Sequence, residues 1–256
     1  HTIAMVHDNN QVTVQTLDLD GTQIGGRTWT KTFNLLGADV ICEDIILNPE
    51  RDIMYIGCQD KSSTEITPGG IWVYSVDLTN YDTRILQVGE KEKDDFRILN
   101  RLQLGIYRAP HPTSNAETLF LFLWDQGISI HQKNTNNRFL YFEGVDAGNL
   151  LFGGLVEIKG EFQAIYDLIG HKDRIVVSGR HTNSSQHVSL TQCQFIRGEE
   201  TMECDGPIKT THIKDGLIGK FNTDQIYAFD RERPSITVYD ATVPLSDDEF
   251  MQTPVY

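Results

Sequence analysis

Two kinds of short apolar strand recur in turn along the whole chain. Strands of the first kind, such as IMYIG, begin at Ile3, Ile53, Leu119, Ile175 and Ile226. Strands of the second kind, such as IWVYSVD, begin at Val12, Ile71, Ile128, Val188 and Ile236. Both kinds advance by about 50 to 60 residues, which leaves room for two further strands in each repeat. We therefore expect an all-β fold, a five-bladed β-propeller closed, or left partly open, where the termini meet.

The second repeat carries the sharpest pattern. Its stretch DIILNPERDIMYIGCQD (Asp44–Asp60), followed by GGIWVYSVDL (Gly69–Leu78), resembles the inner three strands of a blade in propellers of the YVTN or NHL kind. The resemblance implies a propeller fold for the chain. No Trp-Asp dipeptide with a Gly-His partner, repeated kelch glycine doublet or Asp-box series assigns a particular family. A β-sandwich with long hairpins is the alternative fold that stays open.

The repeat predicts one domain over residues 1–256. Its blades are expected at 1–35 together with 243–256, then 36–90, 96–146, 150–210 and 211–242. The interval from Ile236 through both termini to Val12 is shorter than any other interval between strands of this kind. We therefore expect the tail, Val243–Tyr256, to donate a strand to the first blade.

An edge left open at this junction would be a template for strand addition from another chain. The tail contains residues that can blunt such an edge, namely Pro244, Asp247, Asp248, Glu249 and Pro254.

The chain has four cysteines, and their spacing predicts two pairs. A turn over residues 48–52 places Leu47 opposite Ile53, and the same register places Cys42 opposite Cys58. Directly opposed residues on antiparallel strands come close enough for a disulfide.

The second pair follows from the same reasoning. A turn at residues 198–199 pairs Arg197 with Glu200 and thereby places Cys193 opposite Cys204. Free buried thiols and a zinc site are the alternatives, but the chain contains no Cys-x-x-Cys pair. Two disulfides predict a secreted or extracellular protein, because such bonds persist in oxidising compartments.

Two weaker features agree with secretion. Asn183-Ser184-Ser185 is an N-glycosylation acceptor in an expected turn, so Asn183 is a candidate glycosylation site. The chain begins at His1 rather than Met, as it would after removal of a signal peptide.

The formal charge of −14 disfavours nucleic acid and anionic lipid as main partners. The longest apolar run, Leu119–Trp124, is too short to span a bilayer. We therefore expect a protein partner, which includes a second copy of the chain, and neither a nucleic-acid partner nor a membrane span.

No nucleophile elbow, phosphate-binding loop, dinucleotide fingerprint or zinc-protease motif is present in the sequence. Acidic residues on the expected innermost strands are the remaining candidates for chemistry: Glu43, Asp44, Glu161, Asp167 and Asp215. Because the sequence shows no acid at a fixed position of the repeat, a solvated acidic rim is the simpler interpretation. We expect no catalytic residue, no metal site and no cofactor.

The sequence thus predicts a non-catalytic secreted propeller that acts as a structural or protein-interaction module. This prediction includes self-assembly into an extracellular fibre through exchange of terminal strands. The alternative is a secreted hydrolase of glycosides or phosphoesters, with a carboxylate or calcium site at the propeller channel.

Overall fold

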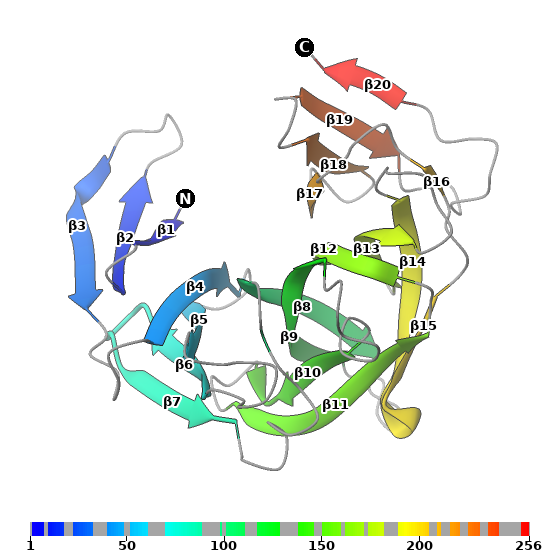
Figure 1. The fold of residues 1–256 in the computed structure, drawn as a ribbon. Helices are drawn as coiled ribbons and strands as arrows, with labels where there is room; N and C mark the ends of the chain where they lie inside the picture. Colours follow the sequence, from blue (N-terminus) through cyan, green and yellow to red (C-terminus); the bar gives the residue numbers. More distant parts are fainter. Residues whose placement is uncertain are drawn as a thin grey trace.

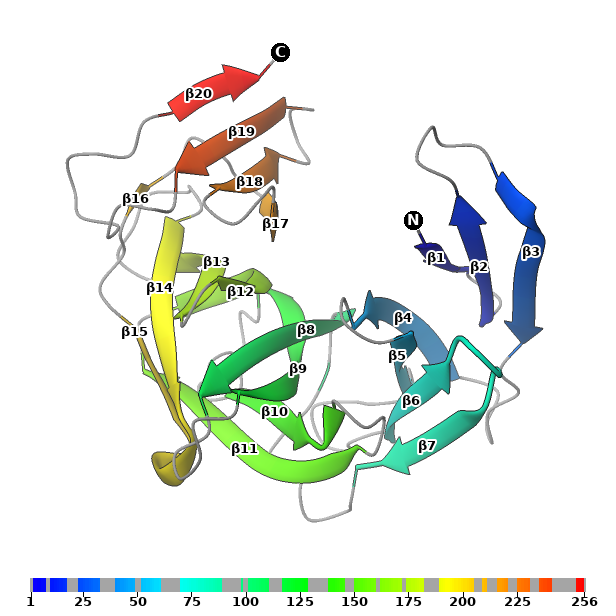
Figure 2. The same ribbon diagram turned by 180° about the vertical axis from the view of Figure 1, so that it is seen from behind.

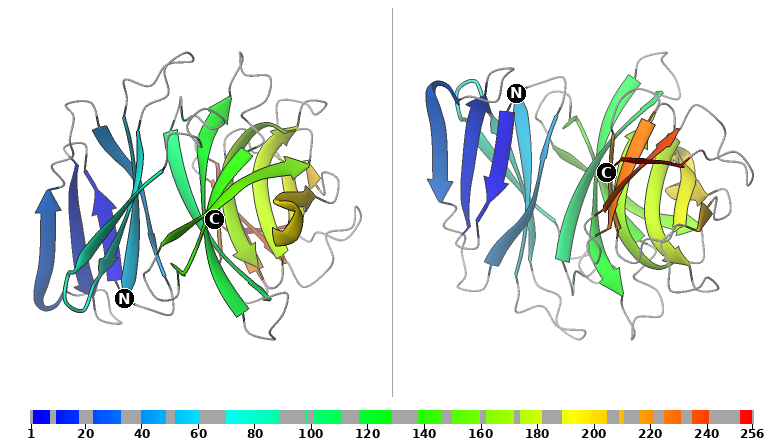
Figure 3. Two further views of the ribbon diagram at one scale, coloured as in Figure 1. Left: turned by 90° about the horizontal axis from the view of Figure 1, so that it is seen from below. Right: turned by 90° about the horizontal axis from the view of Figure 1, so that it is seen from above.

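The structure is a computed structural model that describes residues 2–7, 10–17, 23–32, 40–48, 52–60, 70–88, 98, 101–110, 117–128, 138–145, 150–159, 162–171, 174–181, 189–204, 209–210, 216–220, 225–230, 235–240 and 252–255. Strands make up nearly all of the regular structure in these ranges. The strands form mostly antiparallel sheets that are arranged around a common centre, as propeller blades are (Figures 1 and 2). Seen from the side, the strands stand upright, roughly along the axis of this ring (Figure 3). The fold is therefore all-β and propeller-like.

The first sheet has the order β1-β2-β3 and contains β1 (Thr2–Val6), β2 (Gln11–Leu17) and β3 (Gln23–Thr32). A tight turn joins β1 to β2, in which the His7 N–H donates to the carbonyl of Gln11 at 2.8 Å. Asn10 adopts a positive φ of 61° in this turn, a conformation that Asn tolerates better than most residues.

The second sheet has the order β4-β5-β6-β7 and contains β4 (Val40–Leu47), β5 (Ile53–Asp60), β6 (Ile71–Asp77) and β7 (Thr83–Gln87). β5 is buried along nearly its whole length, which explains why it contains no polar side chain other than that of Tyr55 before Gln59. β4 lies near the centre of the ring and β7 at its outer rim (Figure 1).

The third sheet is the largest. Its first four strands are β8 (Arg101–Pro110), β9 (Glu117–Ile128), β10 (Arg138–Glu143) and β11 (Leu151–Lys159). It continues with β12 (Phe162–His171), β13 (Arg174–His181), β14 (Ser189–Ile196), the 3₁₀ turn η2 (Arg197–Glu199), β15 (Thr201–Cys204) and β16 (Lys209–Thr210). β9 pairs with β12, and the outer strands β11 and β15 pair in parallel, so eight of these strands form a nearly closed, barrel-like sheet.

The last sheet has the order β17-β18-β19-β20 and contains β17 (Gly216–Lys220), β18 (Gln225–Asp230), β19 (Ser235–Asp240) and β20 (Gln252–Val255). The tail strand β20 therefore pairs with β19, with Val238 opposite Thr253, and does not join the first sheet as the sequence predicted. The reason is that β1 and β2 match the second and third strands of the repeat. Among the described residues, the first sheet thus has no inner strand, and the tail instead completes the outer edge of the last sheet.

Two further boundaries differ from the sequence prediction. Leu151–Lys159, expected at the start of the fourth blade, pairs with β10 across a hairpin. The apolar stretch from Glu117 continues to Ile128 as the single strand β9, and the next described strand is Arg138–Glu143. Alternation alone could not separate the end of one long strand from the beginning of another.

The core consists of four apolar clusters, and each lies between two neighbouring sheets or between the two halves of the third sheet. β9 shows how the sequence builds this arrangement, because its alternate side chains enter different clusters. One face packs toward the second sheet with Leu119, Leu121 and Leu123, and the other packs toward β12–β15 with Phe120, Phe122 and Trp124. Within the described ranges, no cluster joins the first sheet to the last.

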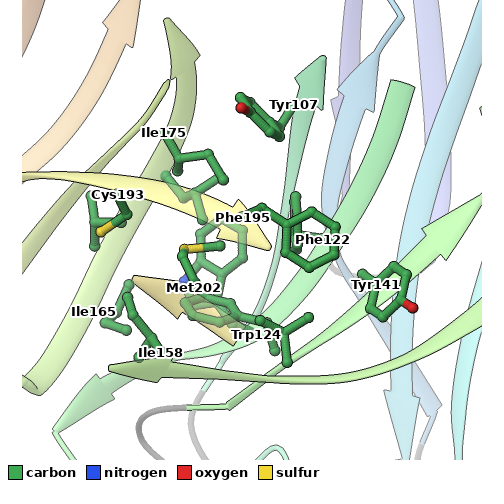
Figure 4. Close-up of a cluster of buried hydrophobic side chains, with 14 of the residues drawn as sticks. Tyr107, Phe122, Trp124, Tyr141, Ile158, Ile165, Ile175, Cys193, Phe195 and Met202 are labelled. Carbon is green, nitrogen blue, oxygen red and sulfur yellow. The ribbon is translucent and has the colours of Figure 1, made fainter. Parts of the chain in front are cut away.

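The largest cluster is aromatic and surrounds Phe195 of β14 (Figure 4). The Phe195 ring lies 5.3 Å from the Phe120 and Phe122 rings and 5.2 Å from the Tyr141 ring, measured between centroids. Phe195 therefore joins β14 to β9 and β10.

Candidate functional site

The acidic residues of the inner strand β4 lie at a β-bulge. Cys42 faces Cys58 and Asp44 faces Gly57, so Glu43 is the extra residue of the bulge. In a regular strand, Glu43 and Asp44 would point to opposite faces of the sheet. The bulge breaks this alternation, and both side chains reach the neighbouring strand β8.

Both carboxyl groups accept hydrogen bonds from the backbone of β8. The Leu102 N–H donates to Glu43 Oε2 at 2.7 Å. The Leu104 N–H donates to Asp44 Oδ2, also at 2.7 Å. The Gln59 side-chain amide donates to the same Glu43 oxygen, and the Arg101 guanidinium donates to the Glu43 carbonyl at 3.3 Å.

The backbone N–H groups of Leu102 and Leu104 face away from β9. Alternate N–H groups of an edge strand have no partner in their own sheet, and leaving them unpaired in a buried position is costly. The acids of the second sheet therefore satisfy the free edge of the strand that begins the third sheet.

Asp167 makes the same kind of contact at the junction between β12 and β17. β12 has a bulge between Ile165 and Asp167, so Asp167 directly follows the bulge, as Asp44 does in β4. The Ile218 N–H of β17 donates to Asp167 Oδ2 at 2.8 Å, and the Leu168 N–H donates to Oδ1 at 2.8 Å. Asp44 and Asp167 thus share a position that is defined by the bulge and not by a fixed spacing, which is why the sequence shows no acid at a fixed position of the repeat.

Polar amides make the corresponding contacts at two other junctions. Asn10, in the turn of the first sheet, donates from Nδ2 to the Val40 carbonyl at 2.6 Å and accepts from the Cys42 N–H at 2.9 Å. Gln126 of β9 donates from Nε2 to the carbonyl of Tyr166, the bulge residue of β12, at 2.6 Å. We call all these side-chain-to-backbone contacts junction bonds.

Among the described residues of the site, Asp44 has the most strongly shifted pKa. Burial raises the pKa of its carboxyl to about 7 from an ordinary value of 3.8, and the charge of Asp167 raises the pKa further. The Leu104 and Ile45 amides and the Arg101 charge lower it, but they do not outweigh the loss of solvation. Asp44 is therefore partly protonated near neutral pH.

A disulfide lies directly beside the bulge. Cys42 and Cys58 are bonded, and so are Cys193 and Cys204, in agreement with the pairing predicted from the sequence. The predicted register of the first hairpin was nevertheless off by one residue, because Leu47 faces Met54 and not Ile53. The bulge at Glu43 restores the register before Cys42.

The other candidates of the sequence prediction are placed as follows. Glu161, Asp215, Asn183 and His1 lie outside the described residues. Within the described ranges, no group of three or more His, Cys, Asp or Glu side chains could hold a metal ion. No helix in this described part of the chain is long and apolar enough to cross a membrane.

Sequence reasoning missed two residues of the site, Asn10 and Gln126. Asn10 lies in a turn cluster that the sequence does mark, but the role of its side chain depends on the position of β4. Gln126 interrupts the apolar sequence of β9 as a buried polar residue, 6% exposed. A buried amide requires a partner, and this requirement is the signal that could have identified it.

Comparisons with known proteins add no assignment. No family model and no curated protein matches the chain. Among solved structures, the chain is similar to Hsv2 of Kluyvelomyces marxianus, with 9% identity and a TM-score of 0.39 over 98% of this chain and 83% of that chain. A likeness of this strength assigns neither a family nor an activity.

Proposed function

We propose that this chain is a secreted, non-catalytic five-bladed β-propeller that acts as a structural or protein-interaction module. In this proposal the blades are β1–β3, β4–β7, β8–β11, β12–β15 and β17–β20. The antiparallel pairing within each group supports the division, although the third and fourth groups are also joined through β9, β11, β12 and β15.

One observation carries the non-catalytic part of the proposal: the inner acids accept backbone amides of the next sheet. A glycosidase needs two carboxyl groups that face a bound substrate. One protonates the leaving-group oxygen, and the other either attacks the sugar or activates a water molecule. Both oxygens of Asp167 already accept backbone N–H groups, and Asp44 is desolvated. In the described part of the chain, these side chains hold neighbouring strands together.

The secreted part of the proposal is supported by the two disulfides, which fit an oxidising compartment. Each closes a short loop, with sequence separations of 16 and 11 residues. The acceptor sequence at Asn183 is consistent with the same compartment.

For the partner, we propose a second copy of the chain that exchanges β20. Hairpin loops usually have about 2 to 5 residues, whereas residues 241–251 separate β19 from β20. A connection of this length permits β20 to pair with β19 of its own chain or of a neighbour. The first and last sheets face each other at the side of the ring where both termini lie (Figure 1), so an exchanged strand would join copies there.

Cysteine trapping tests this exchange, because Val238 and Thr253 lie directly opposite each other in the β19–β20 pair. A Val238→Cys, Thr253→Cys double variant is oxidised at high protein concentration and analysed by non-reducing electrophoresis. Exchange predicts covalent dimers and larger species that are absent from both single variants. A product that is entirely monomeric would contradict self-assembly through β20.

A separate screen tests the non-catalytic assignment. The purified chain is assayed against chromogenic glycosides and phosphoesters, with and without calcium, beside Asp167→Asn as a matched variant. We expect no turnover by either protein. Turnover that is lost in Asp167→Asn would favour the hydrolase.

A further inference from the structure

The junction between the second and third sheets is held by two adjacent acids, of which Asp44 has a pKa raised by burial. Glu43 and Asp44 accept alternate amides of β8, Leu102 N–H and Leu104 N–H, both at 2.7 Å. No other junction described in the structure has two carboxyl groups side by side on a bulge.

Gly57 explains why β8 lies so close to β5. It faces Asp44 in the register of β4 and β5, and a Cβ at this position would overlap Cδ2 of Leu102 and approach Cγ of Leu104 to 3.3 Å. The missing side chain lets both leucines of β8 pack against β5. Their amides are thereby placed within reach of the bulge.

The charges around Asp44 come from a few elements. β12 contributes Asp167, which repels an ionised Asp44, and β8 contributes Arg101, which attracts it. Glu43 is the neighbour on β4 itself. β5 presents Gly57 opposite Asp44, and its one charged residue, Asp60, lies opposite Val40 at the other end of β4. β1 contains no charged residue in Thr2–Val6.

We infer that Asp44 is a proton-dependent clasp between β4 and β8, which holds the two sheets firmly when its carboxyl is neutral and weakens when the carboxyl ionises. A neutral carboxyl still accepts the Leu104 N–H through its carbonyl oxygen. An ionised carboxyl accepts a stronger hydrogen bond, but it also bears the cost of desolvation and the repulsion by Asp167. The inference is independent of the proposed function.

The sign of the pH dependence follows from linkage. The folded-state pKa of Asp44, about 7, lies above its ordinary value of 3.8, so the folded state binds the proton more tightly than the unfolded state. The contribution of Asp44 to stability is fully present below pH 4 and is lost as the pH rises toward 7. The unfolding equilibrium constant rises over this window by at most about a thousandfold through this group.

Asp44→Asn tests the clasp, because an amide keeps an acceptor for the Leu104 N–H but cannot ionise. Urea unfolding is measured from pH 5 to pH 8.5 for the wild type, Asp44→Asn and Glu43→Gln, the last being the same kind of change one residue away. We expect the ratio of wild-type to Asp44→Asn unfolding constants to rise at least about tenfold across this range. The ratio of Glu43→Gln to Asp44→Asn unfolding constants should rise in the same way, because Glu43→Gln leaves Asp44 in place.

Carbon-13 NMR of the Asp44 carboxyl gives a second measurement that does not depend on how well a variant folds. We expect it to titrate near neutral pH in the folded wild type. Titration at the ordinary value for aspartate, or parallel unfolding curves for the wild type and Asp44→Asn, would overturn the inference.

Discussion

Replacement of Phe195 by Ala should be among the most destabilising single changes in this chain. The Phe195 side chain is 7% exposed, and its ring contacts those of Phe120, Phe122 and Tyr141 at centroid distances of 5.2 to 5.3 Å. Truncation removes a buried ring and leaves a cavity between β14 and β9–β10. The expected loss is about 3 to 5 kcal/mol, or about 6 to 20 °C in Tm for a chain of this size.

Phe195→Leu separates the two parts of this loss. Leu keeps most of the apolar contact but removes three aromatic pairs, each worth about 0.5 to 1.5 kcal/mol beyond burial, so we expect a loss of about 2 to 3 kcal/mol. Ile85→Ala on β7 is the matched control, because Ile85 is 59% exposed. It should change stability by no more than about 0.5 kcal/mol. Urea unfolding followed by tryptophan fluorescence measures all three variants. If Phe195→Ala unfolded within about 1 kcal/mol of the control, the cluster would not join these strands as described.

Two further changes test other parts of the structure. Gly57→Ala should cost about 1 to 3 kcal/mol, because its Cβ would overlap Leu102. Gly198→Ala, where nothing lies within 4 Å of the added Cβ, should be nearly neutral in the same urea unfolding assay. Reduction of the two disulfides should add about four hydrogens to the intact mass and lower stability by roughly 3 kcal/mol for each bond; unchanged mass on reduction would show that the bonds are absent.

Much of the architecture follows from local alternation in the sequence. The strands predicted from Ile53, Ile71, Ile175 and Ile226 begin within one or two residues of β5, β6, β13 and β18. The sequence locates these strands because their apolar residues are bounded by clear turns.

The sequence could not reveal which strand pairs with which at the termini. The short interval at that junction predicts a tail strand in the first sheet, whereas β20 pairs with β19. Counting residues gives the number of strands missing from a ring, but it does not say whether the missing strand is inner or outer. That choice depends on which edges the folded sheets leave free.

The site was predicted only in part, for a similar reason. Glu43, Asp44 and Asp167 were recognised as inner acids, but their function depends on two bulges that the apolar pattern does not show. A bulge shifts a side chain by one position, so residues with equivalent contacts do not lie at equal spacing. The partners of these acids are backbone N–H groups, and residue types do not reveal which backbone N–H groups need a partner.

Amide hydrogen exchange at Leu104 and Ile218 measures most directly whether the inner acids act by holding neighbouring strands together. The account predicts strong protection of both amides in the native protein, although each lies on an edge that its own sheet leaves unpaired. Asp167→Ala should speed exchange at the Ile218 amide and leave the Leu104 amide protected. Asp167→Asn keeps an acceptor, so it should change the exchange rate of Ile218 little. Exchange of Leu104 and Ile218 in the wild type at the rate of an unstructured peptide would contradict the account.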